Sequence, residues 1–579
     1  MNRTVVAFAL PVTALGVWIA GTPTNTLAAW LTHPVVAERQ GVDVRAVTLD
    51  GALWWRIAAA ACAASWWIVG LLVARWIARG AIQPEVPQRA APLHARLLLL
   101  AGFVIVVGIT ERIWRITESF WYDEISALID YAQHGPGPII GTYFVPSNHV
   151  MHTLLSWCAI TLLGGINEVI LRVPALVAGL LAIPAVAWLM HEACCSVGRS
   201  VQPRSRVLAV AAAAATAIAP IVVLESCEAR GYSLMILCAA LSSALLLRGM
   251  RTASLACLLA FALSTALGIW SHLVFAGLSI GQGITLLVWM LIVRRDSAAL
   301  RVSGAALAAL CLGAITACTL LTPLLPDMLR IRREFAALDG NEPSLLSSEG
   351  LHLLLGLGGA WSWAAVPALI LVCIGIVGAL GDKPRRLPLA LMLLGLPVVA
   401  LGTALGGSWM YARFGLFALP GCIAALVLGG ADIVAWIIRR TPVPKQAARR
   451  SLIATILVLV VATPWTIHLT QLPPKQPLRD AVEWVLAKDP ITARIGTVGL
   501  ADNVLAYYAV LRGIDIVPTG AGGNRLDALD RDIHWLIVLY PRSIDAKASA
   551  ALQNSWSEHR RLQGWVDWTN GDVIIYRRK

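Results

Sequence analysis

Apolar stretches of about 20 residues recur along this chain, and they contain few charged side chains. A helix of that length crosses the hydrocarbon core of a bilayer. Inside lipid every backbone amide must be satisfied within its own segment, so helices are expected rather than isolated strands. With 58% hydrophobic and 14% charged residues, the chain has more apolar surface than a soluble core can bury. The sequence therefore predicts an all-α, multi-spanning membrane bundle.

The apolar stretches predict about thirteen transmembrane helices. They lie at roughly 5–20, 53–78, 97–112, 170–190, 207–224, 232–248, 252–270, 273–293, 302–322, 354–381, 387–405, 414–438 and 451–468. Residues 149–165 are also apolar, but counting them as a span would invert every later loop. We therefore expect them to form a helix in or near the outer interface. The first stretch is also compatible with a signal peptide cleaved near Ala28–Ala29.

Basic residues mark one side of the predicted bundle. Every second loop is short and basic, for example those with Arg199, Arg204 and Arg206 or with Lys383, Arg385 and Arg386. Short basic loops remain cytoplasmic, so the N-terminus is expected inside and the C-terminus outside. This orientation signal explains the net charge of +13, and we expect no nucleic-acid partner.

Three predicted outer segments are long, namely 112–169, 323–353 and the tail from about 471. In the tail, helix-like stretches at 478–489 and 503–513 alternate with strand-like stretches at 494–500, 534–540 and 572–579. This alternation indicates a small α/β domain on the outer side. Three parts are therefore expected. They are 1–96 (two transmembrane helices and a basic cytoplasmic loop), 97–470 (the main membrane domain) and 471–579 (the extracytoplasmic domain).

The first outer segment holds an acidic pair, Asp123 and Glu124. Apolar residues follow the pair at helical spacing: Ile125, Leu128, Ile129 and Ala132. The pair therefore begins an amphipathic helix, which we expect on the membrane surface. There the carboxylates would lie at the lipid–water boundary, where a lipid-borne group meets a polar acceptor. Helix capping and stabilisation of the first turn are the alternative role, and the two roles are compatible.

Two histidines follow in the same outer segment. His149, His152 and Ser156 share one helical face by their spacing. Two histidines three residues apart are compatible with a metal site, but no third ligand is evident, and an interfacial polar face is the alternative. The 11 cysteines lie mostly within apolar stretches without metal-ligand spacing, so we expect them to act as small apolar residues.

Three further basic residues lie at the outer ends of predicted helices. Arg230, His272 and Arg413 share this depth of the bundle. Ionisable groups there are costly and usually face a partner or a cavity. Together they suit an anionic headgroup, most simply a phosphate. An ion pair between Glu228 and Arg230, or side chains that snorkel to the interface, are the alternatives.

The order of these segments resembles the GT-C glycosyltransferases. It is most similar to the branch that contains protein O-mannosyltransferases and the aminoarabinose transferases of lipid A. The resemblance covers about residues 97–440. The segments that carry it are WYDE, SNHVMHTLLSW, LRVPALVAGLLAIP, ESCEARGYSLM and YARFGLFALPG.

The resemblance implies a GT-C-type enzyme that passes a sugar from a polyprenyl-phosphate donor to an acceptor hydroxyl. The acceptor would be a lipid, a glycan or a protein, and no cofactor would be required. Asp123 would be the catalytic base, with Glu124 as its acidic neighbour. Contacts to the donor phosphate and sugar would come from His149, His152, Arg230, Tyr232, His272 and Arg413. His149 stands where relatives have HPP or KPP, but here Val150 and Met151 follow it.

The chemistry agrees with that role, because a carboxylate can accept the proton of an attacking hydroxyl. A phosphate leaving group needs positive charge and hydrogen-bond donors. A single displacement would invert the anomeric centre. We expect the enzyme in the cytoplasmic membrane of a prokaryote, with its site outside. Two alternatives remain, a transporter or lipid flippase, which predicts inverted repeats and broken helices, and a non-catalytic scaffold.

Overall fold

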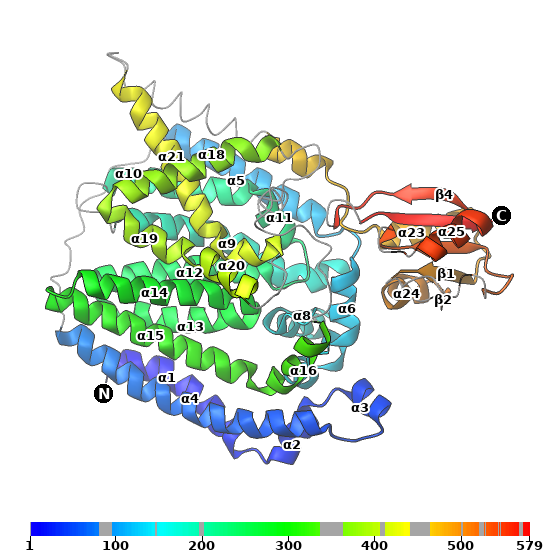
Figure 1. The fold of residues 1–579 in the computed structure, drawn as a ribbon, viewed down its shortest axis with the longest axis horizontal. Coiled ribbons are helices and arrows are strands. Elements are labelled where there is room, and N and C mark those ends of the chain that lie inside the picture. The colour runs from blue at the N-terminus through cyan, green and yellow to red at the C-terminus, as the bar shows by residue number, and fades with distance from the viewer. Residues whose placement is uncertain are drawn as a thin grey trace.

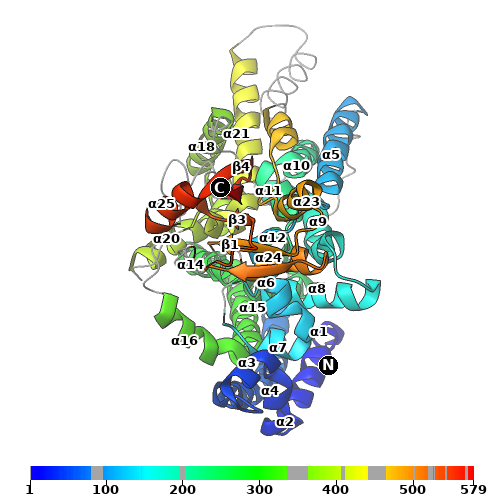
Figure 2. The ribbon, with the colours of Figure 1, turned by 90° about the vertical axis from the view of Figure 1, so that its right-hand side faces the viewer.

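The computed structural model describes residues 2–79, 95–144, 147–195, 202–335, 363–405, 411–440, 464–499, 502–519, 526, 529–541, 544, 546–566 and 571–579. Long helices lie side by side in a bundle, and a small sheet domain projects from one end of it (Figure 1). Figure 2 looks at the molecule from the side of that domain.

The N-terminal part is a pair of long helices, α1 (Arg3–Gly21) and α4 (Ala46–Arg79). The Asn2 side chain accepts a hydrogen bond from the Thr4 amide and caps α1. Two short helices connect the pair, α2 (Thr24–Leu31) and α3 (Pro34–Gln40). They were not anticipated from the sequence, because each is too short to show a clear period. They lie at the same end of the molecule as the first outer segment (Figure 1).

The main bundle is built from helices in the remaining membrane part. They are α5 (Ala95–Arg115), α9 (Glu168–Cys195), α10 (Gln202–Ile218), α11 (Pro220–Ser226), α12 (Tyr232–Thr252), α13 (Leu255–Ser271), α14 (Ala276–Ile292), α15 (Ser297–Leu321), α16 (Leu325–Phe335), α18 (Ala365–Gly381), α19 (Lys383–Leu393), α20 (Gly395–Leu405) and α21 (Leu419–Arg439). One apolar cluster runs through most of them, so the bundle shares a common core.

Eight helices in the described ranges are long and apolar enough to cross a membrane. The number is nine if α10 and α11 form one span, bent by 59°. Pro220 begins α11, and its missing amide hydrogen breaks the helical ladder there. The structure does not confirm the count of about thirteen. Predicted spans 252–270 and 354–381 correspond to α13 and α18, which have 17 residues each and are therefore shorter than the eight. Predicted span 451–468 falls mostly outside the described residues.

The first outer segment contains four short helices. They are α6 (Tyr122–Asp130), η1 (Ala132–His134), α7 (Pro136–Gly141) and α8 (Val150–Leu163). Helix α8 covers the ambiguous stretch 149–165. With 14 residues it is too short for a bilayer core of about 30 Å, in line with the interfacial helix predicted there.

The tail forms a five-stranded sheet in the order β2-β1-β3-β5-β4. Its elements are α23 (Leu478–Lys488), β1 (Arg494–Val498), α24 (Asp502–Val510), β2 (Asp515–Pro518), β3 (Trp535–Val538), α25 (Ala546–Ser555), β4 (Trp556–Leu562) and β5 (Val573–Arg578). Strands β1, β2 and β3 are parallel, whereas β5 is antiparallel to β3 and β4. The predicted α/β character is confirmed, although β2, α25 and β4 were missed.

The sheet domain covers the apolar face of α6. Ile125, Leu128 and Ala132 belong to one buried cluster with Leu505 and Ala509 of α24. Helix α24 contacts α6, and the two lie together in Figure 2. The apolar stripe that predicted an amphipathic helix on the membrane surface is therefore buried against protein. A hydrophobic stripe specifies that a helix face is covered, but not whether lipid or protein covers it.

Candidate active site

The acidic pair divides into two different environments at the start of α6. Trp121 precedes the helix, and its amide donates to Glu124 Oε2 at 3.2 Å. Glu124 therefore caps the helix, as the alternative interpretation expected for one member of the pair. Asp123 keeps its side chain away from this cap and remains 22% exposed.

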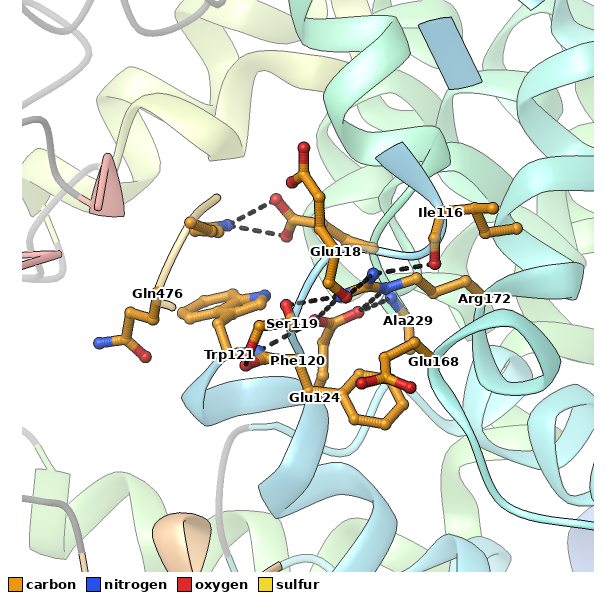
Figure 3. A network of polar contacts seen from close by, with 12 residues as sticks. Ile116, Glu118, Ser119, Phe120, Trp121, Glu124, Glu168, Arg172, Ala229 and Gln476 are labelled. Carbon is orange, nitrogen blue, oxygen red and sulfur yellow. Dashed lines mark hydrogen bonds and ion pairs between the residues drawn. The ribbon is translucent and has the colours of Figure 1, made fainter. Parts of the chain in front are cut away.

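Glu124 is fully buried in a clamp with Arg172 of α9 (Figure 3). Arg172 Nε donates to Glu124 Oε1 at 2.7 Å, and its Nη2 donates to Oε2 at 2.6 Å. The Ala229 amide also donates to Oε1, at 2.6 Å. All of these contacts use the lone pairs of Glu124, so its carboxylate holds α6 in place rather than facing open space.

Arg172 is a site residue that the sequence analysis missed. Besides Glu124, its guanidinium donates to the carbonyl oxygens of Ile116, Glu118 and Ser119, at 3.1, 2.6 and 3.0 Å (Figure 3). It therefore fixes the loop before α6 as well as the helix. One signal was available: an arginine inside a predicted span is costly unless it has a partner.

Asp123 pairs with Arg230, which lies between α11 and α12. Arg230 Nη1 lies 2.9 Å from Asp123 Oδ2, and the Arg230 side chain is only 6% exposed. On its other side, Arg230 Nε and Nη2 lie 3.2 and 3.1 Å from His149 Nε2. One guanidinium therefore joins two predicted site residues.

His149 accepts from the guanidinium, so its ring is neutral and carries its proton on Nδ1. Burial and the neighbouring Arg230 charge hold the pKa of His149 well below its ordinary value. The rings of Trp121 and Tyr232 also flank Arg230, with centroids 5.2 and 4.9 Å from its Cζ. These contacts fix the position of the guanidinium.

Aromatic rings pack together beside Arg230. The rings of His149, Tyr232 and His272 are mutually close, with centroids 5.3, 5.0 and 4.8 Å apart. Phe414 contacts His272 at 6.2 Å. Burial, followed by the charge of Arg230, lowers the pKa of His272 to about 3. His272 is therefore neutral here, and the positive charge expected at this depth comes from the two arginines.

Arg413 is the second of these arginines. Its Cζ lies 4.8 Å from the centroid of Tyr411, and its charge lowers the pKa values of His149 and His272. The structure therefore brings Arg413 to the same cluster as Arg230, although the two are far apart in sequence.

His152 lies one turn beyond His149 on α8 and is buried. Its Nδ1 is 3.4 Å from Ser156 Oγ, and burial lowers its pKa to about 3. Its Nε2 has no hydrogen-bond partner within the part of the chain that the structure describes. Among the described residues, no three His, Cys, Asp or Glu side chains are grouped as metal ligands.

Glu228 does not pair with Arg230, contrary to the alternative ion pair. Its carboxylate oxygens accept from Lys475 Nζ at 2.8 and 2.7 Å. Lys475 also lies 3.8 Å from the centroid of the Trp121 ring. Lys475 was missed because it is 247 residues from Glu228 in sequence.

The segment that enters the sheet domain holds the loop before α6. The Tyr122 amide donates to Gln476 Oε1 at 3.0 Å, and the Phe120 amide donates to the Tyr508 hydroxyl at 2.8 Å. The Arg479 amide donates to Ser119 Oγ at 3.0 Å. The backbone leading to Asp123 is thus fixed by residues from the opposite end of the chain.

No family model and no curated protein matches the chain. Solved structures do resemble it. The oligosaccharyltransferase AglB from Archaeoglobus fulgidus, in complex with an inhibitory peptide and a dolichol-phosphate, has a TM-score of 0.45 and 12% identity over 80% of this chain and 73% of that one. ArnT from Cupriavidus metallidurans in the apo state has a TM-score of 0.47 and 12% identity, over 83% of this chain and 97% of that one.

The arabinosyltransferase EmbB from Mycobacterium smegmatis has a TM-score of 0.41 and 14% identity, over 88% of this chain and 49% of that one. These neighbours are GT-C fold glycosyltransferases. They belong to the class that the sequence motifs resemble. All three TM-scores are below 0.5, so the chemistry of this site rests on its own residues.

Proposed function

We propose that this protein is a membrane glycosyltransferase. It transfers a sugar from a polyprenyl-phosphate donor to an acceptor hydroxyl on the outer side of a prokaryotic cytoplasmic membrane. The acceptor is a lipid, a glycan or a protein. The observation that carries the proposal is the contact of a partly exposed carboxylate, Asp123, with a buried, aromatic-lined guanidinium, Arg230. The first can accept a proton and the second can hold a phosphate.

In the proposed reaction, Asp123 accepts the proton of the acceptor hydroxyl as its oxygen attacks the anomeric carbon. The bond from that carbon to the phosphate oxygen breaks, and its electron pair leaves with the phosphate. Arg230 and Arg413 stabilise the charge that develops there. A single displacement of this kind inverts the anomeric centre, through a transition state with oxocarbenium character.

The other candidate residues take supporting roles in this proposal. His149 accepts hydrogen bonds from Arg230 and orients it. Tyr232 and His272 offer ring faces to the sugar, and His152 extends the polar face of α8. Glu124, expected beside the base, positions α6 through Arg172. The two arginines provide positive charge at the phosphate, so the proposal requires no metal, and transfer should persist in a chelator.

Thermal unfolding of the detergent-purified protein tests the donor. Among the similar structures, one ArnT structure is bound to undecaprenyl phosphate and the AglB structure contains a dolichol-phosphate. We therefore choose sugars linked to polyprenyl phosphate as ligands, with bare polyprenyl phosphate and sugar nucleotides as controls. A ligand that binds only the folded state raises the unfolding temperature. Stabilisation by a lipid-linked sugar but not by nucleotides supports the proposal, and stabilisation by nucleotides alone contradicts it.

Substitution of the base tests the chemistry. Asp123→Asn keeps the size of the side chain but removes its basicity, so transfer should fall by roughly 10²–10⁴-fold. The fold should survive with reduced stability, because α6 stays capped by Glu124 while the buried Arg230 loses its charged partner, so the rate is compared per folded protein. Asp130→Asn, at the other end of α6, is the matched control and should transfer normally. Wild-type transfer by Asp123→Asn would refute its assignment as the base.

A lipid flippase is the second candidate, and the break between α10 and α11 is the observation that favours it. Reconstituted vesicles separate the two functions. A flippase moves a labelled polyprenyl phosphate between leaflets without an acceptor, whereas the proposed transferase consumes the donor only when an acceptor is present.

A further inference from the structure

Arg230 has two partners on opposite sides, and the contacts differ in kind. His149 Nε2 lies within hydrogen-bonding distance of both Nε and Nη2. The contact to Asp123 runs from Nη1 to Oδ2, at 2.9 Å. Among the described residues, no group makes an aligned hydrogen bond with Nη1 although it is buried. The carboxylate therefore neutralises the guanidinium without completing its hydrogen bonding.

The two side chains of the Asp123–Arg230 ion pair are also held in place to different degrees. Arg230 is held by His149 and by the rings of Trp121 and Tyr232. Asp123 is the more exposed partner. The backbone under Asp123 is fixed, since Glu124 is clamped by Arg172. A ligand that competes for Nη1 therefore needs to displace only one carboxylate side chain.

We infer that Asp123 and an anionic phosphate compete for Arg230, so that binding of the donor phosphate releases Asp123 from its ion pair. This inference rests on the proposed function. Before the donor arrives, the carboxylate compensates the buried guanidinium, which would otherwise be a costly unpaired charge. When a phosphate takes that place, the carboxylate becomes available to the acceptor hydroxyl. The base is thus freed only when a donor is present.

A double-mutant cycle tests this competition in the full-length protein. The four proteins are the wild type, Asp123→Asn, Arg230→Gln and the double variant. The probe is bare polyprenyl phosphate, titrated in detergent at one ionic strength. Competition predicts that Asp123→Asn binds the probe roughly tenfold more tightly than the wild type. In the Arg230→Gln background the same substitution should change the affinity by less than about twofold.

The double variant separates competition from simple repulsion between two anions. Repulsion through space does not need Arg230, so it predicts the same gain from Asp123→Asn in both backgrounds, which would overturn the inference. Arg230→Lys is a further control. It keeps the positive charge for which the two anions compete, so the gain from Asp123→Asn should persist in this background, and its loss would contradict the competition.

Asp130→Asn is the matched control. It removes a carboxylate from the other end of α6, where Asp130 accepts a hydrogen bond from Ser126, and it should leave the affinity unchanged. Equal affinities of the wild type and Asp123→Asn would overturn the competition and leave the proposed donor in place. No binding by any of the proteins would overturn both the competition and the proposed donor.

Discussion

Two neighbouring carboxylates have different roles because their partners differ. Glu124 accepts from Arg172 through both oxygens, in a fully buried environment. Asp123 is partly exposed, and its Oδ2 lies 2.9 Å from Nη1 of Arg230. A buried carboxylate with several charge-assisted hydrogen bonds is a structural anchor. In the proposed reaction, the more exposed one becomes available as the base once a phosphate takes its place at Arg230.

Glu124→Gln should destabilise the protein strongly, since it leaves the Arg172 guanidinium buried without a counter-charge. Breaking one partner of a buried ion pair costs about 3–5 kcal/mol. Thermal unfolding in detergent measures the effect. An unfolding temperature equal to that of the wild type would show that the clamp is not needed for stability.

His152 should make the protein sensitive to acid. Burial lowers its pKa to about 3, below the value of 6.5 expected when the chain unfolds. Between these values the unfolded state binds more protons than the native state, so stability falls as the pH falls below 6.5. The loss from pH 6.5 to 5.5 is about 1 kcal/mol. His152→Gln should lose less stability over the same interval, and an unchanged profile would contradict this origin.

At the scale of elements, the segment between the bundle and the sheet domain acts on the site. Lys475 neutralises Glu228 and lies over the ring of Trp121, the residue before α6. The next residue, Gln476, accepts from the Tyr122 amide. Trp121 in turn faces the Arg230 guanidinium. The position of α6 relative to Arg230 thus depends on a connecting segment far along the chain.

Lys475→Met should lower kcat by roughly 10²-fold, because small displacements of catalytic groups have effects of that size. Donor affinity should change little, since Lys475 does not contact Arg230. Lys475→Arg keeps the charge and should restore most of the rate. If Lys475 only stabilised the fold, kcat would instead fall in proportion to the fraction of protein that is folded. A loss of affinity at unchanged kcat would refute positioning.

At the scale of the whole molecule, the two ends of the chain hold the first outer segment from different sides. The sheet domain fixes it through Tyr508, and the segment that connects this domain to the bundle fixes it through Gln476. The N-terminal helices contribute His33, whose Nε2 lies 2.6 Å from the Asp130 carbonyl oxygen. In Figures 1 and 2, α2 and α3 lie to one side of α6 and the sheet domain covers another.

A buried ion pair joins the N-terminal part to this arrangement. Arg45 donates to both oxygens of Asp327 at 2.9 Å, and the Tyr143 amide donates to Oδ2 at 3.1 Å. Asp327→Asn should therefore lower stability by about 3–5 kcal/mol. The control is Asp382→Asn, which breaks a more exposed pair with Arg385 and should cost less than about 1 kcal/mol. Similar losses in both variants would contradict the bridging role.

Much of the fold follows from the sequence alone. Apolar length specifies helices that cross a bilayer, and the alternating tail specifies an α/β domain, because both are local patterns. The sequence also places Arg230, His272 and Arg413 at one depth of the bundle. Depth follows from the position of each residue along its own helix, without knowledge of the neighbours.

Only the tertiary structure decides which of these residues meet. It pairs Arg172 with Glu124 and Lys475 with Glu228. It also places Arg230 in contact with both Asp123 and His149. It also covers the apolar face of α6 with protein instead of lipid. An apolar helix face or a buried charge requires a partner. Which residue becomes that partner depends on packing between segments hundreds of residues apart. Local sequence thus determines which apolar faces must be covered and which charges need a partner. The fold determines which residues cover those faces and pair with those charges.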